Sequence, residues 1–173
     1  MLAVQAGHLA EMAAPGDEKA FAELVRASSR TLYAAARAIL RSDQDAQDCV
    51  QEAILKGWKS LPALKDRSFF RTWLTRITIN TAINMARKRR PGAPLLAELP
   101  ARDDRCEERL DIRRAIEALD EKTRVCTVLF YFEDMPTAEI ARATGMREGT
   151  VRTRLFRARE KLRNVLEGYG HAE

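Results

Sequence analysis

Apolar residues recur at every third or fourth position along almost the whole chain, and strand-like alternation is nearly absent. This spacing places the apolar side chains on one side of an α-helix. It predicts helices over residues 20–40, 44–60, 69–88, 107–119 and 122–133, and two more in the last 40 residues. Ser42 and Asp43 supply the cap of the second helix, and 61–68, which contains Pro62, is expected to be a loop.

The helical pattern stops at Arg90-Pro91-Gly92-Ala93-Pro94, because Pro and Gly at this density break a helix. No apolar period persists from there to about Cys106. We therefore predict an all-α fold of two small helical domains, 1–90 and 107–173, joined by a flexible linker over 91–106.

The segment 136–162 has the form of a helix-turn-helix. Pro136 suits an early helical position, and Gly145 can adopt the left-handed conformation that ends the first helix. Met146 is expected to fill the angle between the helices. The second helix starts near Glu148, and at about 100° per residue one narrow arc, its buried stripe, holds Val151, Leu155, Ala158 and Leu162.

The opposite side of this second helix carries the residues expected to meet DNA. The side chains expected to reach base edges in the major groove are Thr153, Phe156 and Arg157, and Arg152 flanks this face. Those expected to contact phosphates are Thr150, Arg154, Arg159 and Lys161. Arg157 can bond bidentately to a guanine, whereas Phe156 can touch thymine methyl groups. The alternative is that Phe156 packs on another helix and the arginines are only solvated.

The helix over 69–88 has two usable faces. Its inward face is expected to hold Leu74, Thr75, Thr78, Ile79, Ala82, Met85 and Ala86. The opposite stripe holds Phe70, Trp73, Ile77, Asn80 and Asn84, flanked by Arg76, Arg87 and Lys88. Aromatic, amide and cationic groups on one surface suit single-stranded nucleic acid. The alternative is that Trp73 and Ile77 are core residues.

Acidic and amide side chains gather near the start of the helix over 44–60, at Asp45, Asp48, Gln51 and Glu52. They can simply compensate the helix dipole, or they can form a docking surface for a basic partner helix. The sequence leaves both possibilities open.

Composition favours a nucleic-acid partner and argues against a metal site, a cofactor and an enzyme. The chain has 173 residues, a formal net charge of +5 and an excess of arginine, which favours a polyanionic partner. Cys49, Cys106 and Cys126 lack metal-ligand spacing, and His8 and His171 lie near the ends, so we expect no metal, no cofactor and no catalytic residue. With no signal peptide and no long apolar run, we expect a soluble, cytoplasmic protein without membrane insertion.

Three stretches, 45–58, 70–90 and 148–162, together resemble the extracytoplasmic-function (ECF) sigma factors in order and in residue pattern. The resemblance covers roughly 20–166. It implies an alternative sigma factor, without catalytic activity, that binds core RNA polymerase and directs it to specific promoters. It further implies promoter DNA, duplex and single-stranded, and an anti-sigma factor as partners, and no stable homo-oligomer.

The resemblance also implies roles for residues of this sequence. Asp45, Asp48, Gln51 and Glu52 would face the clamp helices of the largest polymerase subunit. The minus-ten element would be read by Asn80 and Asn84 with Trp73, Arg76 and Arg87, and a loop around 64–68 would hold a flipped base with Lys65, Ser68 and Phe69. Arg152, Thr153, Phe156 and Arg157 would meet the minus-thirty-five element, and 91–105 would pass near the RNA exit path.

The sequence departs from the family pattern in two places. Arg147 stands where a small capping residue is usual, and Thr75 and Thr78 replace more usual aromatic and small residues. The competing interpretation is a helix-turn-helix regulator that binds duplex DNA without being a polymerase subunit. The second, single-strand-suited face over 73–87 argues against it.

Overall fold

The computed structural model describes residues 18–88 and 106–167, which form seven α-helices, two short 3-10 turns and no β-strand. The N-terminal half (18–88) consists of α2 (Glu18–Leu40), α3 (Asp43–Ser60) and α4 (Phe70–Lys88). The expected loop between α3 and α4 contains the 3-10 turns Leu61–Ala63 and Arg67–Phe69. The all-α prediction is confirmed.

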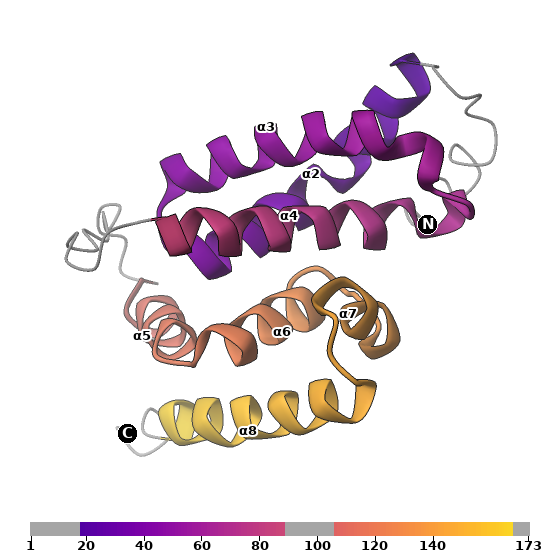
Figure 1. Ribbon diagram of the computed structural model, residues 1–173. Helices are drawn as coiled ribbons and strands as arrows, with labels where there is room; N and C mark the ends of the chain where they lie inside the picture. Colours follow the sequence, from indigo (N-terminus) through magenta and orange to yellow (C-terminus); the bar gives the residue numbers. More distant parts are fainter. Residues whose placement is uncertain (1–17, 89–105, 168–173) are drawn as a thin grey trace.

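The C-terminal half (106–167) consists of α5 (Cys106–Glu117), α6 (Glu121–Tyr131), α7 (Thr137–Thr144) and α8 (Glu148–Glu167). In Figure 1 the three N-terminal helices lie together above the four C-terminal ones, with α6 and α7 beneath α4 and α8 farthest from it. The segment expected to be a linker lies almost entirely outside the described residues.

The helix ends follow from local chemistry. The Ser42 hydroxyl caps α3 by accepting a hydrogen bond from the Asp45 N–H at 3.3 Å, and Asp120 caps α6 by accepting from the Thr123 N–H at 3.1 Å. Gly145 ends α7 with a φ of 72°, the left-handed conformation that a side chain would disfavour. Pro136 differs slightly from expectation, because it is the N-cap of α7 rather than its first residue.

One hydrophobic cluster belongs to the N-terminal half. It is formed by Phe21, Leu24, Leu32, Leu61, Phe70 and Leu74. The α3 and α4 helices approach closely at Gly57, where an added Cβ would lie 2.6 Å from Leu74 Cδ1. Leu74 is fully buried, so any side chain at position 57 would force Leu74 to move within the core.

A second cluster crosses between the two halves. It joins Ala35, Ile39, Ile79 and Ala82 to Val125, Leu129, Met135, Ile140, Val151 and Leu155. Through this cluster, helix α6 packs on helix α2, and helix α7 packs on helix α4. Two domains were predicted from the sequence, but the continuous core that they share was not.

Candidate nucleic-acid interface

Helix α8 turns its predicted DNA-reading side away from the protein. Val151, Leu155 and Ala158 are buried, as the periodicity predicts. Phe156 is 60% exposed, and the side chains on its side of the helix at Arg152, Thr153 and Arg157 are exposed as well. The expectation that Phe156 and Arg157 face outward is confirmed. An exposed Phe beside an Arg on one helix face is a surface suited to base edges and thymine methyl groups.

Glu148 fixes the angle between the two helices of the helix-turn-helix. Its Oε1 accepts hydrogen bonds from Thr137 Oγ1 and from Arg152 Nη2, both at 2.7 Å. These two hydrogen bonds hold the pKa of Glu148 below its usual value. The start of α7 is thereby tied to the start of α8. The Arg147 carbonyl accepts the N–H groups of Thr150 and Val151, so α8 begins regularly despite the bulky residue there.

Three of the four expected phosphate contacts, Thr150, Arg159 and Lys161, are exposed on α8. Arg154 differs from the free cation that we expected. Its Nη1 donates to Asp120 Oδ1 and to Thr123 Oγ1, both at 2.9 Å, and the side chain is only 25% exposed. Arg154 therefore links α8 to the first turn of α6, where Asp120 attracts it.

On α4, four of the predicted minus-ten residues lie along one exposed stripe. They are Arg76, Asn80, Asn84 and Arg87. Phe70 was placed on this stripe by the sequence analysis, and that placement was wrong, because Phe70 is 2% exposed and packs edge-on against Phe21. Trp73 is half-buried at 5.8 Å from the Phe70 ring. It packs against the core cluster while keeping part of its surface exposed.

The loop before α4 presents Lys65, Ser68 and Phe69 at the surface. Asp66 Oδ1 accepts from the Ser68 N–H at 3.0 Å and from Ser68 Oγ at 2.6 Å, which shapes the turn. The Arg142 guanidinium of α7 stacks over the Phe69 ring at 4.4 Å from its centroid. Asp66 was not among the residues predicted for this loop, although an Asp two residues before a Ser is a signal of such a turn.

The predicted docking surface lies on α3. Asp48, Gln51 and Glu52 are exposed, and Asp45 is half-buried. Leu55, which the sequence analysis did not single out, is 64% exposed one turn after Gln51 and Glu52. The surface therefore combines acidic and amide groups with one exposed apolar side chain, as protein interfaces commonly do.

Other kinds of site find no support in the part of the chain that the structure covers. Within 18–88 and 106–167, no three His, Cys, Asp or Glu side chains are grouped so that they could hold a metal ion. Cys49 and Cys126 are buried, and burial raises the pKa of both thiols to about 11. In the same ranges, no helix has the length and apolar character to cross a membrane.

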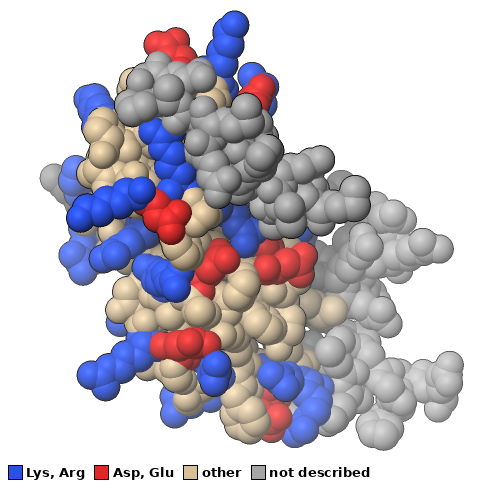
Figure 2. Space-filling model, turned by 90° about the vertical axis from the view of Figure 1, so that its right-hand side faces the viewer, with Lys and Arg blue, Asp and Glu red and all other residues tan. Residues whose placement is uncertain are grey.

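Figure 2 shows basic side chains on both halves of one face, with acidic ones among them.

Comparison with known families agrees with this geometry. The Sigma-70 region 2 family matches residues 24–91, and the Sigma-70 region 4 family matches residues 109–162. These matches and the helical fold define the class: a sigma-70-type protein with regions 2 and 4.

Individual relatives show which subfamily of sigma-70-type proteins this chain belongs to. The ECF RNA polymerase sigma-E factor of Escherichia coli is 32% identical, covering 92% of this chain and 93% of the relative. The ECF sigma factor SigM of Mycobacterium tuberculosis is 33% identical over 89% of this chain and 80% of the relative. This chain belongs to the ECF subfamily of RNA polymerase sigma factors, as the sequence predicted.

Two solved structures have a similar fold. The first is CnrH in complex with the cytosolic domain of CnrY, with a TM-score of 0.67, 29% identity and 96% coverage of both chains. The second is the sigma factor RpoE in complex with the anti-sigma factor NepR from Bartonella quintana, with a TM-score of 0.68 and 22% identity. It covers 86% of this chain and 98% of that chain.

Proposed function

We propose that this sigma factor binds core RNA polymerase and reads promoters through two helices, α8 at the minus-thirty-five element and α4 at the minus-ten element. The observation that carries the proposal is the outward position of Phe156 and Arg157 on α8, opposite that helix's own buried stripe. Asn80 and Asn84 supply the corresponding exposed side chains on α4.

At the minus-thirty-five element, α8 lies in the major groove of duplex DNA. Arg157 bonds to a guanine edge, and Phe156 and the Thr153 methyl group contact thymine methyl groups. Arg152 takes part in base contact after exchanging its hydrogen bond with Glu148 for one to DNA. Thr150, Arg159 and Lys161 contact phosphates and fix the register of the helix. Arg154 keeps its structural ion pair with Asp120.

At the minus-ten element, α4 contacts unpaired bases. The amides of Asn80 and Asn84 hydrogen-bond to base edges, while Arg76 and Arg87 follow the backbone. The exposed part of Trp73 lies at the N-terminal end of the same stripe of α4. The loop with Lys65, Ser68 and Phe69 holds a flipped base.

The α3 surface with Asp48, Gln51, Glu52 and Leu55 docks on a basic, partly apolar helix of the polymerase, and Asp45 adds to its negative charge. We further propose an anti-sigma factor as a regulatory partner. The complex of CnrH, a 29% identical protein, with a second protein supports a protein partner of this kind. The chain acts in the cytoplasm as a monomeric specificity subunit and not as an enzyme.

Transcription in vitro tests the proposal. Core polymerase is supplied with this chain and fragmented genomic DNA, and the 5′ ends of the transcripts are sequenced. We expect starts at a limited set of sites that share two sequence blocks upstream. The Asn80→Ala, Asn84→Ala double variant is expected to lose these starts while still binding the polymerase.

The result that would overturn the proposal is a set of transcripts identical with and without the chain. If the chain then still bound specific duplex sites by itself, a helix-turn-helix regulator that is not a polymerase subunit would replace the present proposal.

A further inference from the structure

A cavity of about 590 Å³ is lined by α2, α5 and α6, together with the chain directly after α2 and α6. This volume lies within the range of small-molecule sites, about 300–1,000 Å³. The described residues around the cavity include three carboxylates and five arginines, Arg30, Arg37, Arg41, Arg113 and Arg124. Such an excess of cations around one cavity favours an anionic ligand.

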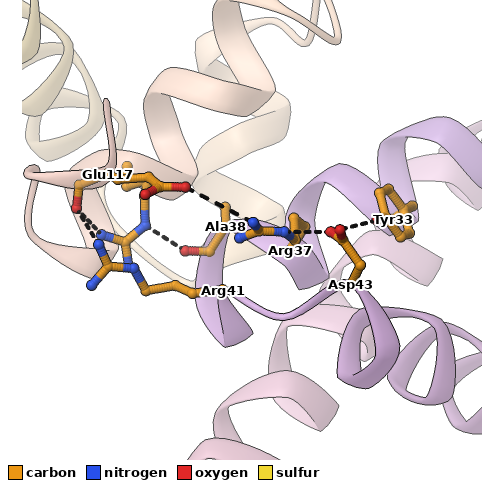
Figure 3. Close-up of polar contacts among 7 residues, drawn as sticks. Tyr33, Arg37, Ala38, Arg41, Asp43 and Glu117 are labelled. Carbon is orange, nitrogen blue, oxygen red and sulfur yellow. Dashed lines mark hydrogen bonds and ion pairs between the residues drawn. The ribbon is translucent and has the colours of Figure 1, made fainter. Parts of the chain in front are cut away.

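The three carboxylates are engaged by only two of these arginines. Asp43 Oδ1 accepts a hydrogen bond from Arg37 Nε at 2.6 Å, and Glu117 Oε1 lies 3.9 Å from Arg37 Nη2 (Figure 3). Glu133 Oε1 accepts from Arg30 Nε at 2.9 Å. The positive charges of the other three arginines are therefore left without a carboxylate of the cavity.

Arg124 of α6 is the most buried of these three, at 6% exposed. Its Nε donates to the Ala38 carbonyl at 2.6 Å, and its Nη1 donates to the carbonyls of Glu117 at 3.1 Å and Leu119 at 2.6 Å. Its Nη2 makes no hydrogen bond to any residue that the structure describes. A buried cation usually has an anionic partner, because burial without one is costly. Arg124 has only carbonyl oxygens as partners, so its charge remains available to a bound anion.

Arg41 lies beside Arg124 and forms no ion pair within 18–88 and 106–167. Its Nη2 donates to the Glu117 carbonyl at 2.8 Å, so the two guanidinium groups share one neutral acceptor (Figure 3). Burial and, second, the positive charge of Arg41 lower the pKa of Arg124. An anion bound between the two guanidinium groups would relieve this repulsion.

The backbone of Arg41 adopts a conformation that arginine rarely takes. Its φ is 58°, in the left-handed region, at the position directly after α2 where glycine is the usual residue. Strained backbone of this kind is concentrated at functional sites. The conformation of Arg41 therefore supports a role for its side chain that glycine could not supply.

The rest of the lining sets the size and character of the ligand. Ile116, Val128 and Phe132 supply apolar surface, and Tyr33 is held in place by a hydrogen bond from its hydroxyl to Asp43 Oδ1 at 2.9 Å. Guanidinium groups match the geometry of phosphate oxygens, and aromatic rings can cover a planar ring. The cavity thus suits a ligand with both a phosphate part and an apolar or planar part.

We propose that this cavity binds a nucleoside diphosphate, with its phosphates between Arg41 and Arg124 and its base against the apolar side of the lining. Arg113, exposed on α5, adds positive charge at the edge of the site. None of the residues proposed to contact DNA or polymerase lines the cavity, so this site and the promoter-reading function stand or fall separately.

Calorimetric titration of the full chain tests the site. The probes are ADP, GDP and pyrophosphate, each without divalent cations and at physiological salt. At least one of the two nucleotides should bind with one-to-one stoichiometry, and pyrophosphate should bind more weakly because it has no base to bury. No binding of either nucleotide, or equal binding of pyrophosphate and the nucleotides, would overturn the proposal.

The variant Arg41→Gly tests where the phosphates lie. It removes one guanidinium group, yet it gives the left-handed position its usual residue, so the chain should remain folded by circular dichroism. Nucleotide binding should weaken by roughly 10- to 150-fold, the usual loss for a hydrogen bond between charged groups. Undiminished binding by folded Arg41→Gly would contradict the proposed position of the phosphates.

Two control variants separate the site from general effects. Asp134→Gly makes the same kind of backbone change at the other described non-glycine residue with a positive φ, 48°, which does not line the cavity. Arg26→Ala removes an exposed cation of α2 that lies outside the cavity. Both should bind the nucleotide as wild type does. Equal weakening by Arg26→Ala and Arg41→Gly would mean diffuse attraction to a basic protein and would refute a specific site.

Discussion

Helices α4 and α8 are of nearly equal length, and both carry side chains suited to nucleic acid, yet their surroundings differ. Helix α8 buries one stripe and leaves the opposite side open, where Phe156 is 60% exposed. Helix α4 is contacted by α2, α3 and α7. It buries Phe70, Thr72, Leu74, Thr75, Thr78, Ile79, Thr81 and Ala82.

The difference teaches that the usable surface of a helix is set by which of its sides the neighbours cover, because α8 also packs against three helices, α5, α6 and α7, yet buries only one stripe. One buried stripe leaves α8 a broad outer face, so its recognition residues contribute little to stability. On α4 the recognition residues are confined to the narrow stripe from Arg76 to Arg87. Substitutions on α4 are therefore more prone to affect folding and recognition together.

The largest expected effect is on the free energy of unfolding, and it is tested by substituting one residue in each helix. Leu74 is fully buried, so Leu74→Ala should cost about 2–5 kcal/mol in the free energy of unfolding, from lost burial and the cavity left behind. Phe156→Ala should change it by less than about 0.5 kcal/mol, because the side chain is mostly in solvent. Urea unfolding followed by circular dichroism measures both. A Phe156→Ala variant as unstable as Leu74→Ala would show that α8 is not an open helix.

Two glycines sharpen the same comparison. Gly57→Ala would bring a Cβ within 2.6 Å of Leu74 Cδ1, and overpacking of this kind should cost about 1–3 kcal/mol. At Gly149 on α8 no atom lies within 4 Å of an added Cβ, so Gly149→Ala should be stabilising by up to about 1 kcal/mol through helix propensity. Thermal unfolding of both variants should give shifts of opposite sign, and shifts of the same sign would contradict this account of the α3–α4 crossing.

The next effect separates base reading from phosphate contact on α8. Arg157→Ala should cost about 1–3 kcal/mol of discrimination at one base pair of the upstream block. Arg159→Ala should instead weaken all sequences about equally and make the salt dependence shallower. Binding of polymerase complexes to duplexes with single base-pair changes distinguishes the two. Uniform weakening by Arg157→Ala would mean that a different side of the helix faces the bases.

The smallest expected effect is on the stability of the protein at acidic pH. The hydrogen bonds from Thr137 and Arg152 keep the pKa of Glu148 below its usual 4.5 in the folded protein. The stability that this carboxylate contributes is therefore present above pH 4.5 and is lost as the pH falls through the lower folded value. Glu148→Gln should make the loss of stability below pH 4.5 shallower than in wild type, as measured by urea unfolding at several pH values. Unchanged acid sensitivity would contradict the role of Glu148 at the start of α8.

Local features of the fold could be predicted from the sequence. The 3.6-residue period located the helices to within about two residues, and it identified the buried stripe of α8 because that stripe depends on α8 alone. Gly145 and Ser42 were predictable because turn and cap chemistry involves only near neighbours in the chain.

What could not be predicted involves partners far apart in the chain. Phe70 is buried because Phe21 packs on it, and Arg124 is buried because it meets the carbonyl of Ala38, 86 residues away. Arg154 finds Asp120 in the same way. Periodicity says which side of a helix is apolar, but it does not say which other helix covers the remaining sides.

The central claim is that α4 and α8 each face promoter DNA. A photoreactive amino acid placed at Asn84 in one variant and at Phe156 in another, each assembled with core polymerase on a promoter found by transcript mapping, tests this directly. The account predicts a cross-link from position 84 to the downstream block and one from position 156 to the upstream block, about 25 base pairs apart. Cross-links from both positions to the same block, or from neither position to DNA, would contradict it.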